Sequence, residues 1–191
     1  MKVPRIPVIL LVGLIAGCAS QSSTKPVEVL DERSAVTVGA LKEPIELVPG
    51  PQNVVLILRR RTSFAYLGPV EWNRSGVLSY GLWIHIAPGN DRQPGDIHAS
   101  SAVTVVLDDG TLDLSVIDAP KLGREPYQPV ASWGQTAYFG LTAETLRRMA
   151  ASSKLVLDVR TVDGSLMSFT PTLDARAVLT QYAKDRGITG D

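Results

Sequence analysis

Residues 154–169 read Lys-Leu-Val-Leu-Asp-Val-Arg-Thr-Val-Asp-Gly-Ser-Leu-Met-Ser-Phe, and no other stretch indicates the fold class as clearly. Two strand-like runs, 154–162 and 165–169, flank the pair Asp163-Gly164. An Asp-Gly pair between such runs predicts a tight β-hairpin, because both residues tolerate the positive φ angles of the turn. Leu155, Leu157 and Val159 alternate with polar residues, so one face of this hairpin should be buried and the other solvated.

The same pattern extends over much of the chain upstream. Runs 102–107 and 111–117 flank a second Asp-Gly pair, Asp109-Gly110, and predict a second hairpin. Asn73-Arg74-Ser75-Gly76 has the composition of a turn between strands. Further strand-like runs lie at 36–38, 45–47, 54–58, 64–67, 77–86 and 135–141.

Two helices are predicted in the C-terminal third. Thr142 can cap a helix from Ala143 to about Ser152. Asp174 can cap a second helix, in which Ala175, Val178, Leu179 and Tyr182 repeat at helical spacing and Gly187 is a plausible end. We expect the stripe of the second helix to pack on its own sheet, with docking of a partner as the alternative. The predicted fold is therefore α+β, mainly an antiparallel β-sheet or sandwich of about eight strands with two helices late in the chain.

The N-terminal residues have the layout of a secretory signal. Lys2 and Arg5 precede an unbroken apolar run from Val8 to Ala16, and Gly17 and Cys18 follow it. This run is too short to cross a bilayer as a helix, which takes about 20 apolar residues. A positive start, a short apolar region and small residues at its end are typical of a cleaved export signal.

Ile15-Ala16-Gly17-Cys18 resembles the lipobox of bacterial lipoproteins. The resemblance implies that residues 1–17 are a signal peptide, that Cys18 becomes the acylated N-terminus, and that its lipid anchors the protein in a membrane. Because residue 19 is Ala and not Asp, the resemblance further implies the outer membrane, facing the periplasm. We expect residues 18–35 to be a flexible tether, since Ala-Ser-Gln-Ser-Ser-Thr is small and polar, and residues 36–191 to form a single domain.

Composition narrows the classes of partner. The chain has 191 residues and no net charge, so losing Lys2 and Arg5 would leave a net charge of about −2. This balance argues against nucleic acid as a partner, and against a polybasic membrane-binding surface. Cys18 is the only cysteine, so no disulfide can form within the chain.

The sequence contains few motifs that are typical of a catalytic or metal-binding site. It contains no Gly-x-Ser-x-Gly, His-Glu-x-x-His, phosphate-loop or Cys-x-x-Cys motif. The most polar stretch is 88–98, and His85, Asp91, Asp96 and His98 around it are a candidate ligand or metal set. The competing interpretation is a solvated loop with two surface histidines. We expect no cofactor.

Aromatic residues are spread along the predicted strands and are expected mainly in the core. Trp72 and Trp133 lie beside turn residues and are the two candidates for exposed, ligand-stacking rings. Taken together, these features favour a non-catalytic envelope binding or scaffold lipoprotein with a protein or cell-wall partner. An envelope hydrolase or metal-dependent enzyme centred on His85 to His98, and a carrier of an apolar ligand, are the alternatives.

Overall fold

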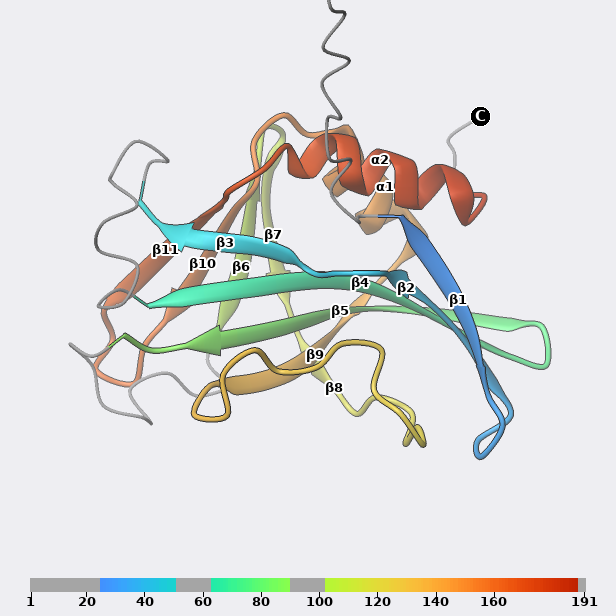
Figure 1. Cartoon of the computed structure of the whole chain (residues 1–191). Helices are drawn as coiled ribbons and strands as arrows, with labels where there is room; N and C mark the ends of the chain where they lie inside the picture. Colours follow the sequence, from blue (N-terminus) through green and yellow to red (C-terminus); the bar gives the residue numbers. More distant parts are fainter. Residues whose placement is uncertain (1–24, 51–62, 90–101, 189–191) are drawn as a thin grey trace, which may run out of the picture.

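The computed structural model describes residues 25–50, 63–89 and 102–188, which form one antiparallel sheet and two helices (Figure 1). The strands are β1 (Pro26–Asp31), β2 (Val36–Leu41), β3 (Ile45–Pro49), β4 (Phe64–Arg74), β5 (Val77–Ala87), β6 (Val103–Leu107), β7 (Gly110–Leu114), β8 (Val116–Ile117), β9 (Gln135–Leu141), β10 (Val156–Arg160) and β11 (Leu166–Pro171). The helices are α1 (Ala143–Ala151) and α2 (Ala175–Asp185). This confirms the predicted α+β class with a mainly antiparallel sheet.

The sheet curls until its two ends nearly meet. Its strand order is β7-β6-β10-β11-β3-β4-β5-β9-β8, and β2 with β1 branches from β4. Only Ser115 separates β7 from β8 in the chain, so one short segment pairs with β6 at one end of the order and with β9 at the other. The result is a nearly closed, barrel-like sheet.

Both Asp-Gly turns form where predicted, but the predicted strand 111–117 is divided, because β7 pairs with β6 whereas β8 pairs with β9. Residues 107 and 110 are partners across the β6–β7 turn, and Arg160 and Leu166 are partners in β10 and β11. Within each pair, only the glycine takes a positive φ, +137° at Gly110 and +86° at Gly164. Leu155, Leu157 and Val159 are all buried, which confirms the expected inward face.

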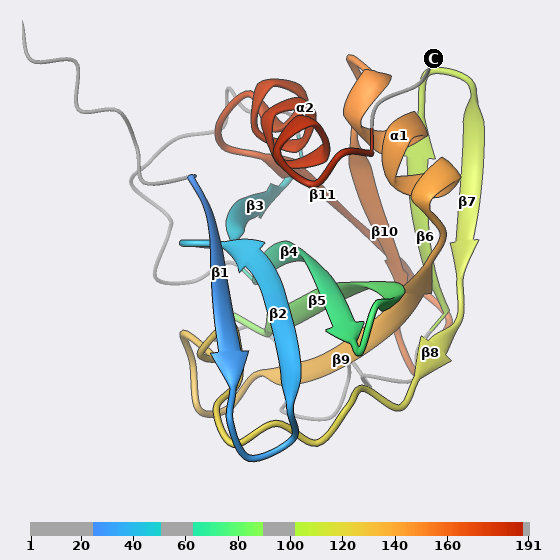
Figure 2. The ribbon, with the colours of Figure 1, turned by 90° about the vertical axis from the view of Figure 1, so that its right-hand side faces the viewer.

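The helices pack on each other and close one end of the curled sheet (Figure 2). The predicted caps are present: the side chains of Thr142 and Asp174 accept hydrogen bonds from the N–H groups of residues 145 and 177. Gly187 follows α2 with φ +67°, the left-handed conformation expected of a glycine that ends a helix. The stripe of α2 is core, because Ala175, Val178, Leu179 and Tyr182 are buried. Neither helix within the described ranges is long and apolar enough to cross a membrane.

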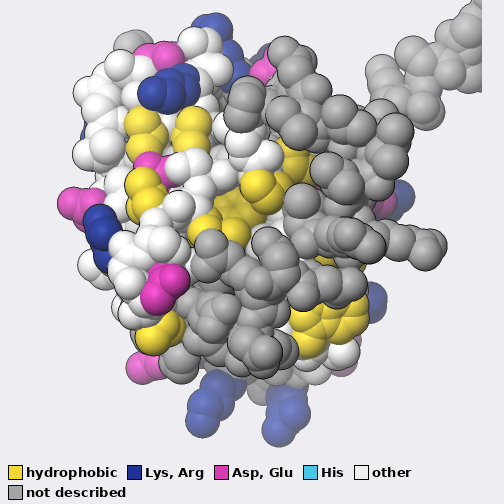
Figure 3. All heavy atoms as spheres, turned by 90° about the vertical axis from the view of Figure 1, so that its left-hand side faces the viewer, with side chains coloured by type: hydrophobic (Ala, Val, Ile, Leu, Met, Phe, Trp, Pro, Cys, Tyr) yellow, Lys and Arg dark blue, Asp and Glu magenta, His cyan; other side chains and the backbone are white. Residues whose placement is uncertain are grey.

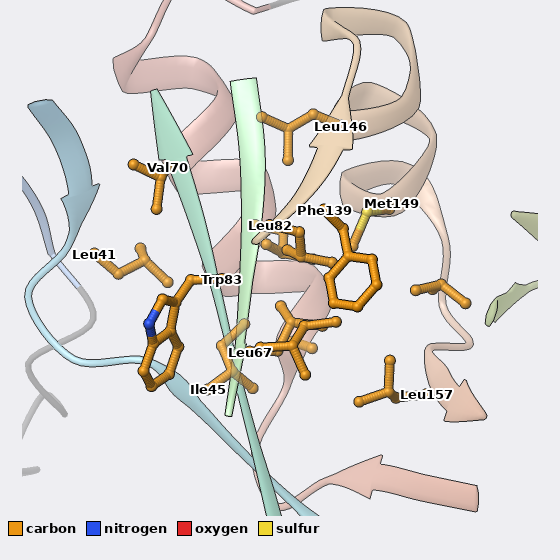
Figure 4. Packing of buried hydrophobic residues seen from close by; sticks show 14 of the residues in the cluster. Leu41, Ile45, Leu67, Val70, Leu82, Trp83, Phe139, Leu146, Met149 and Leu157 are labelled. Carbon is orange, nitrogen blue, oxygen red and sulfur yellow. The ribbon is translucent and has the colours of Figure 1, made fainter. Parts of the chain in front are cut away.

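The core lies between the sheet and the helices. Leu82 of β5 and Phe139 of β9 are register partners, and in Figure 4 they lie toward Leu146 and Met149 of α1. All four side chains are at most 1% exposed. Trp83 projects from the opposite face of β5, so this central strand is buried on both sides.

The structure differs from the prediction at the start of the domain. The sequence predicts a tether up to residue 35, but residues 26–31 form β1 and pair with β2 along their whole length. β1 contains Val27, Val29 and Leu30, but most of its residues are exposed, and it directly follows the small polar run that predicts a tether. β4 is also longer than the predicted run 64–67, and the predicted strand at 54–58 lies outside the described residues.

Candidate functional site

The outer face of β4, β5 and β9 carries a band of large rings. Pairing places Tyr66, His85 and Thr136 in one row and Gly68, Trp83 and Tyr138 in the next. The segment 118–134, between β8 and β9, covers part of this band. Tyr127 packs on Trp83 with a ring-centroid distance of 5.1 Å.

His85 lies in this band and is fully buried. Its ring stacks on Trp83 at 5.8 Å between centroids, and its Nδ1 is 2.8 Å from Oγ1 of Thr136. Gly134 covers the other ring nitrogen so closely that a Cβ there would come within 2.6 Å of Nε2. Nε2 has no hydrogen-bond partner in the described part of the chain. Burial lowers the pKa of His85, because the charged imidazolium would lose its hydration.

Of the candidate ligand set the structure describes only His85, so the set itself stays a prediction. Asp91, Asp96 and His98 lie outside the described residues. Residues 25–50, 63–89 and 102–188 contain no group of three or more metal-ligating side chains. The interpretation of His85 as a surface histidine is wrong, because β5 is a central strand and the 118–134 segment covers it.

Of the two candidate tryptophans, one is buried and the other is exposed. Trp72 is only 2% exposed, so its prediction as an exposed ring is wrong. Its ring lies over Gly81, where a Cβ would come within 2.5 Å, and 5.6 Å from the ring of Tyr138. Trp133 is 56% exposed, with its indole N–H donating to the carbonyl of Pro88 at 3.4 Å.

A groove runs along β1 and β2 on the same outer side of the sheet, and we call it the β1 groove. Its volume is about 460 Å³. The two strands and residues 124–128 line it. Val38 and Ala40 of β2 are buried and form an apolar floor, and Val27, Val29 and Leu30 of β1 and Pro126 add exposed or half-buried apolar side chains. The charged or polar residues of the rim are Asp31, Lys42, Arg124, Glu125 and Gln128.

Further exposed apolar residues lie at the end of the sheet where the β1–β2 and β4–β5 hairpins project (Figure 1). Val29 and Leu30 of β1 are 59% and 60% exposed, and Val77 and Leu78 at the start of β5 are 71% and 48% exposed. Register places Leu30 and Leu78 in one row across β1, β2, β4 and β5. Apolar side chains also reach the surface at the opposite end of the molecule, but there they adjoin residues that the structure does not describe (Figure 3).

Specific contacts fix both walls of the groove. The N–H of Gly123 donates to Oδ1 of Asp31 at 3.0 Å, which ties residues 118–134 to β1. Hydrogen bonds from Ser34 lower the pKa of Asp31, so this carboxylate stays ionised as an acceptor. The guanidinium of Arg186 donates to the Val27 carbonyl at 2.9 Å and pairs with Glu28 at 2.6 Å, which fastens β1 to the end of α2.

Sequence reasoning missed this site because it assigned residues 26–31 to the tether. The available signal was the alternation of apolar and polar residues in Pro26-Val-Glu-Val-Leu-Asp31. No protein-family model, curated protein or solved structure matches this chain. Function is therefore inferred from the β1 groove and from the N-terminal sequence.

Proposed function

We propose that this protein is a lipid-anchored protein of the cell envelope that binds a partner protein through the β1 groove and catalyses no reaction. The observation that carries the proposal is the exposed apolar strand β1 beside a groove with an apolar floor and a charged rim. The lipobox around Cys18 supports the anchor, and Ala19 supports an outer-membrane location facing the periplasm.

The partner that fits this site best is an extended segment of another protein. Within the described chain β1 pairs with β2 alone, so its other edge has main-chain groups for a further strand. Val27 and Val29 lie on the face of β1 that lines the groove, and they can pack against alternate side chains of such a segment. The rim has Lys42 and Arg124 as well as Asp31 and Glu125, and a polar rim of mixed charge is typical of protein interfaces.

The alternatives fit the geometry less well. An enzyme centred on His85 needs an imidazole that a substrate can reach, and His85 is sealed by Trp83 and Gly134. A carrier needs space within the curled sheet. Large side chains such as Phe139, Leu82 and Leu67 fill the interior that the structure describes.

Site-specific photocross-linking in intact cells tests the partner. A photoreactive amino acid replaces Val29 in the full-length protein, and a matched protein has the same replacement at Val162. Both positions are exposed, at 59% and 69%, but Val162 lies outside the groove. We expect a discrete adduct with one protein at position 29 and none at position 162. Equal patterns at the two positions would exclude the groove as the binding site.

Metabolic labelling with palmitate tests the anchor separately. We expect label in the wild type and none in Cys18→Ser, because the acylation chemistry requires the thiol. Sucrose-gradient fractionation should then place the labelled protein with the outer membrane. Label that persists in Cys18→Ser would contradict the proposed anchor without affecting the cross-linking result.

A further inference from the structure

A second groove lies between the two helices, on the side facing away from the core. Its volume is about 570 Å³, and we call it the helix groove. Ala150, Ala151, Ala183 and Ile188 give it an apolar lining of mostly small side chains. Thr180 holds the two helices together across it by donating to the carbonyl of Ala150 at 2.9 Å.

Among the described residues, the charged side chains that line the helix groove all have the same sign. They are Arg147, Arg176 and Lys184, and no carboxylate of the described chain lines the groove. Arg147 forms an ion pair with Glu144 one turn earlier in α1. Arg176 and Lys184 are exposed, and neither has an ion-pair partner among the described residues. Although the whole chain has no net charge, the helix groove is thus a local site for an anion.

The proposed anchor would hold this surface near the membrane. β1 begins at Pro26, and the Val27 carbonyl is bonded by Arg186 directly after α2. The chain therefore enters the domain at the helix end. The eight residue steps from Cys18 to Pro26 can span at most about 28 Å. A lipid on Cys18 would keep the helices within that reach of the headgroups, whereas the β1–β2 turn lies at the far end of β1.

We propose that the helix groove docks on anionic phospholipid headgroups of the membrane that holds the Cys18 lipid. This inference rests on the proposed anchor. The cations match the headgroup phosphates, and the small apolar side chains between them let the helix surface approach the bilayer closely. Docking would orient the domain with its helices toward the membrane and with the β1–β2 turn and the neighbouring β4–β5 turn away from it, where a partner can reach them.

Spin labelling of the lipidated full-length protein in vesicles tests the orientation. Cys18 is the only cysteine and would be acylated, so Ala151→Cys gives a single reactive thiol at the edge of the helix groove. Val162→Cys is the control, because residue 162 follows β10 at the end remote from both helices. Collisions of the nitroxide with nickel chelated to lipid headgroups are measured by power saturation. The vesicles contain neutral phosphatidylcholine alone or with one-third phosphatidylglycerol.

We expect frequent collisions at position 151 and few at 162 in the anionic vesicles at low salt. Each of Arg176→Gln and Lys184→Gln should lower the ratio of docked to undocked protein about fivefold. In neutral vesicles or at high salt, positions 151 and 162 should show equally few collisions. The inference would be overturned if the collision frequency at position 151 were the same in neutral and anionic vesicles, or if it were unchanged in both Arg176→Gln and Lys184→Gln. Either result would leave the proposed anchor intact. Protein recovered without lipid on Cys18 would overturn the anchor and the inference together.

Discussion

The ring of Tyr127 lies directly on the backbone of Gly68, so closely that a Cβ at residue 68 would come within 2.4 Å of it. The buried Tyr127 hydroxyl donates to the Pro69 carbonyl and accepts from the N–H of Leu41, both at 2.8 Å. One side chain thus joins β2, β4 and the 118–134 segment. Since that segment forms one wall of the β1 groove, Tyr127 is a structural support of the proposed binding site.

Tyr127→Phe should lower the free energy of unfolding by about 1–3 kcal/mol, because it leaves a buried N–H and a buried carbonyl without this partner. Denaturant titration measures the change. Tyr138→Phe is the matched control, since the Tyr138 hydroxyl bonds the exposed carboxylate of Glu125 and water can replace that bond. It should cost less than about 0.5 kcal/mol. Equal costs in the two variants would contradict the supporting role of Tyr127.

His85 should make the protein less stable in mild acid. Burial lowers its pKa in the folded protein, so below an unfolded pKa of about 6.5 the unfolded chain takes up a proton that the folded chain excludes. The stability is fully present above that pH. It falls as the pH drops further, at up to about 1.4 kcal/mol per pH unit until the folded pKa is reached.

Denaturant titrations at pH 7.5 and 5.5 measure this effect. The wild type should lose more stability between these pH values than His85→Gln does. His98→Gln is the natural control, since the chain has two histidines. His98→Gln shows how much of the pH-dependent loss of stability comes from the second histidine. Parallel pH profiles for wild type and His85→Gln would show that His85 does not carry the effect.

Leu179→Ala should destabilise the fold without acting on recognition. Leu179 is fully buried in α2, so its truncation should cost about 2–5 kcal/mol. Thermal melting and the cross-linking yield at position 29 are measured on the same variant. The yield per folded molecule should be unchanged. A stable variant that no longer cross-links would instead identify the α2 stripe as an interface.

The sequence predicted the elements that depend on local signals. Asp163-Gly164, the Thr142 and Asp174 caps and the stop at Gly187 all act within a few residues, and each lies where predicted. The closure of the sheet was not predictable, because Ser115 joins two strands whose partners, β6 and β9, are set by pairing over long sequence distances.

The candidate site was predicted less well, for similar reasons. Trp72 stands beside a turn in the sequence but is buried because Gly81, on the next strand, leaves room for its ring. His85 is buried by Gly134, which is 49 positions further along the chain. The position of β1 depends on its pairing with β2 and on its hydrogen bonds with Arg186 and Gly123. These contacts come from distant parts of the chain, so residues 26–31 alone do not predict them.

Cross-linking from across the β1 groove tests the central proposal most directly. A photoreactive residue replaces Gln128, which is exposed on the wall opposite β1, in proteins that also have Val29→Lys or, as a control, Val162→Lys. Both substitutions place a charge at an exposed position, so neither should alter melting. We predict that the partner adduct formed at position 128 is lost with Val29→Lys and retained with Val162→Lys. An adduct that persists at full yield with Val29→Lys would contradict binding through the β1 groove.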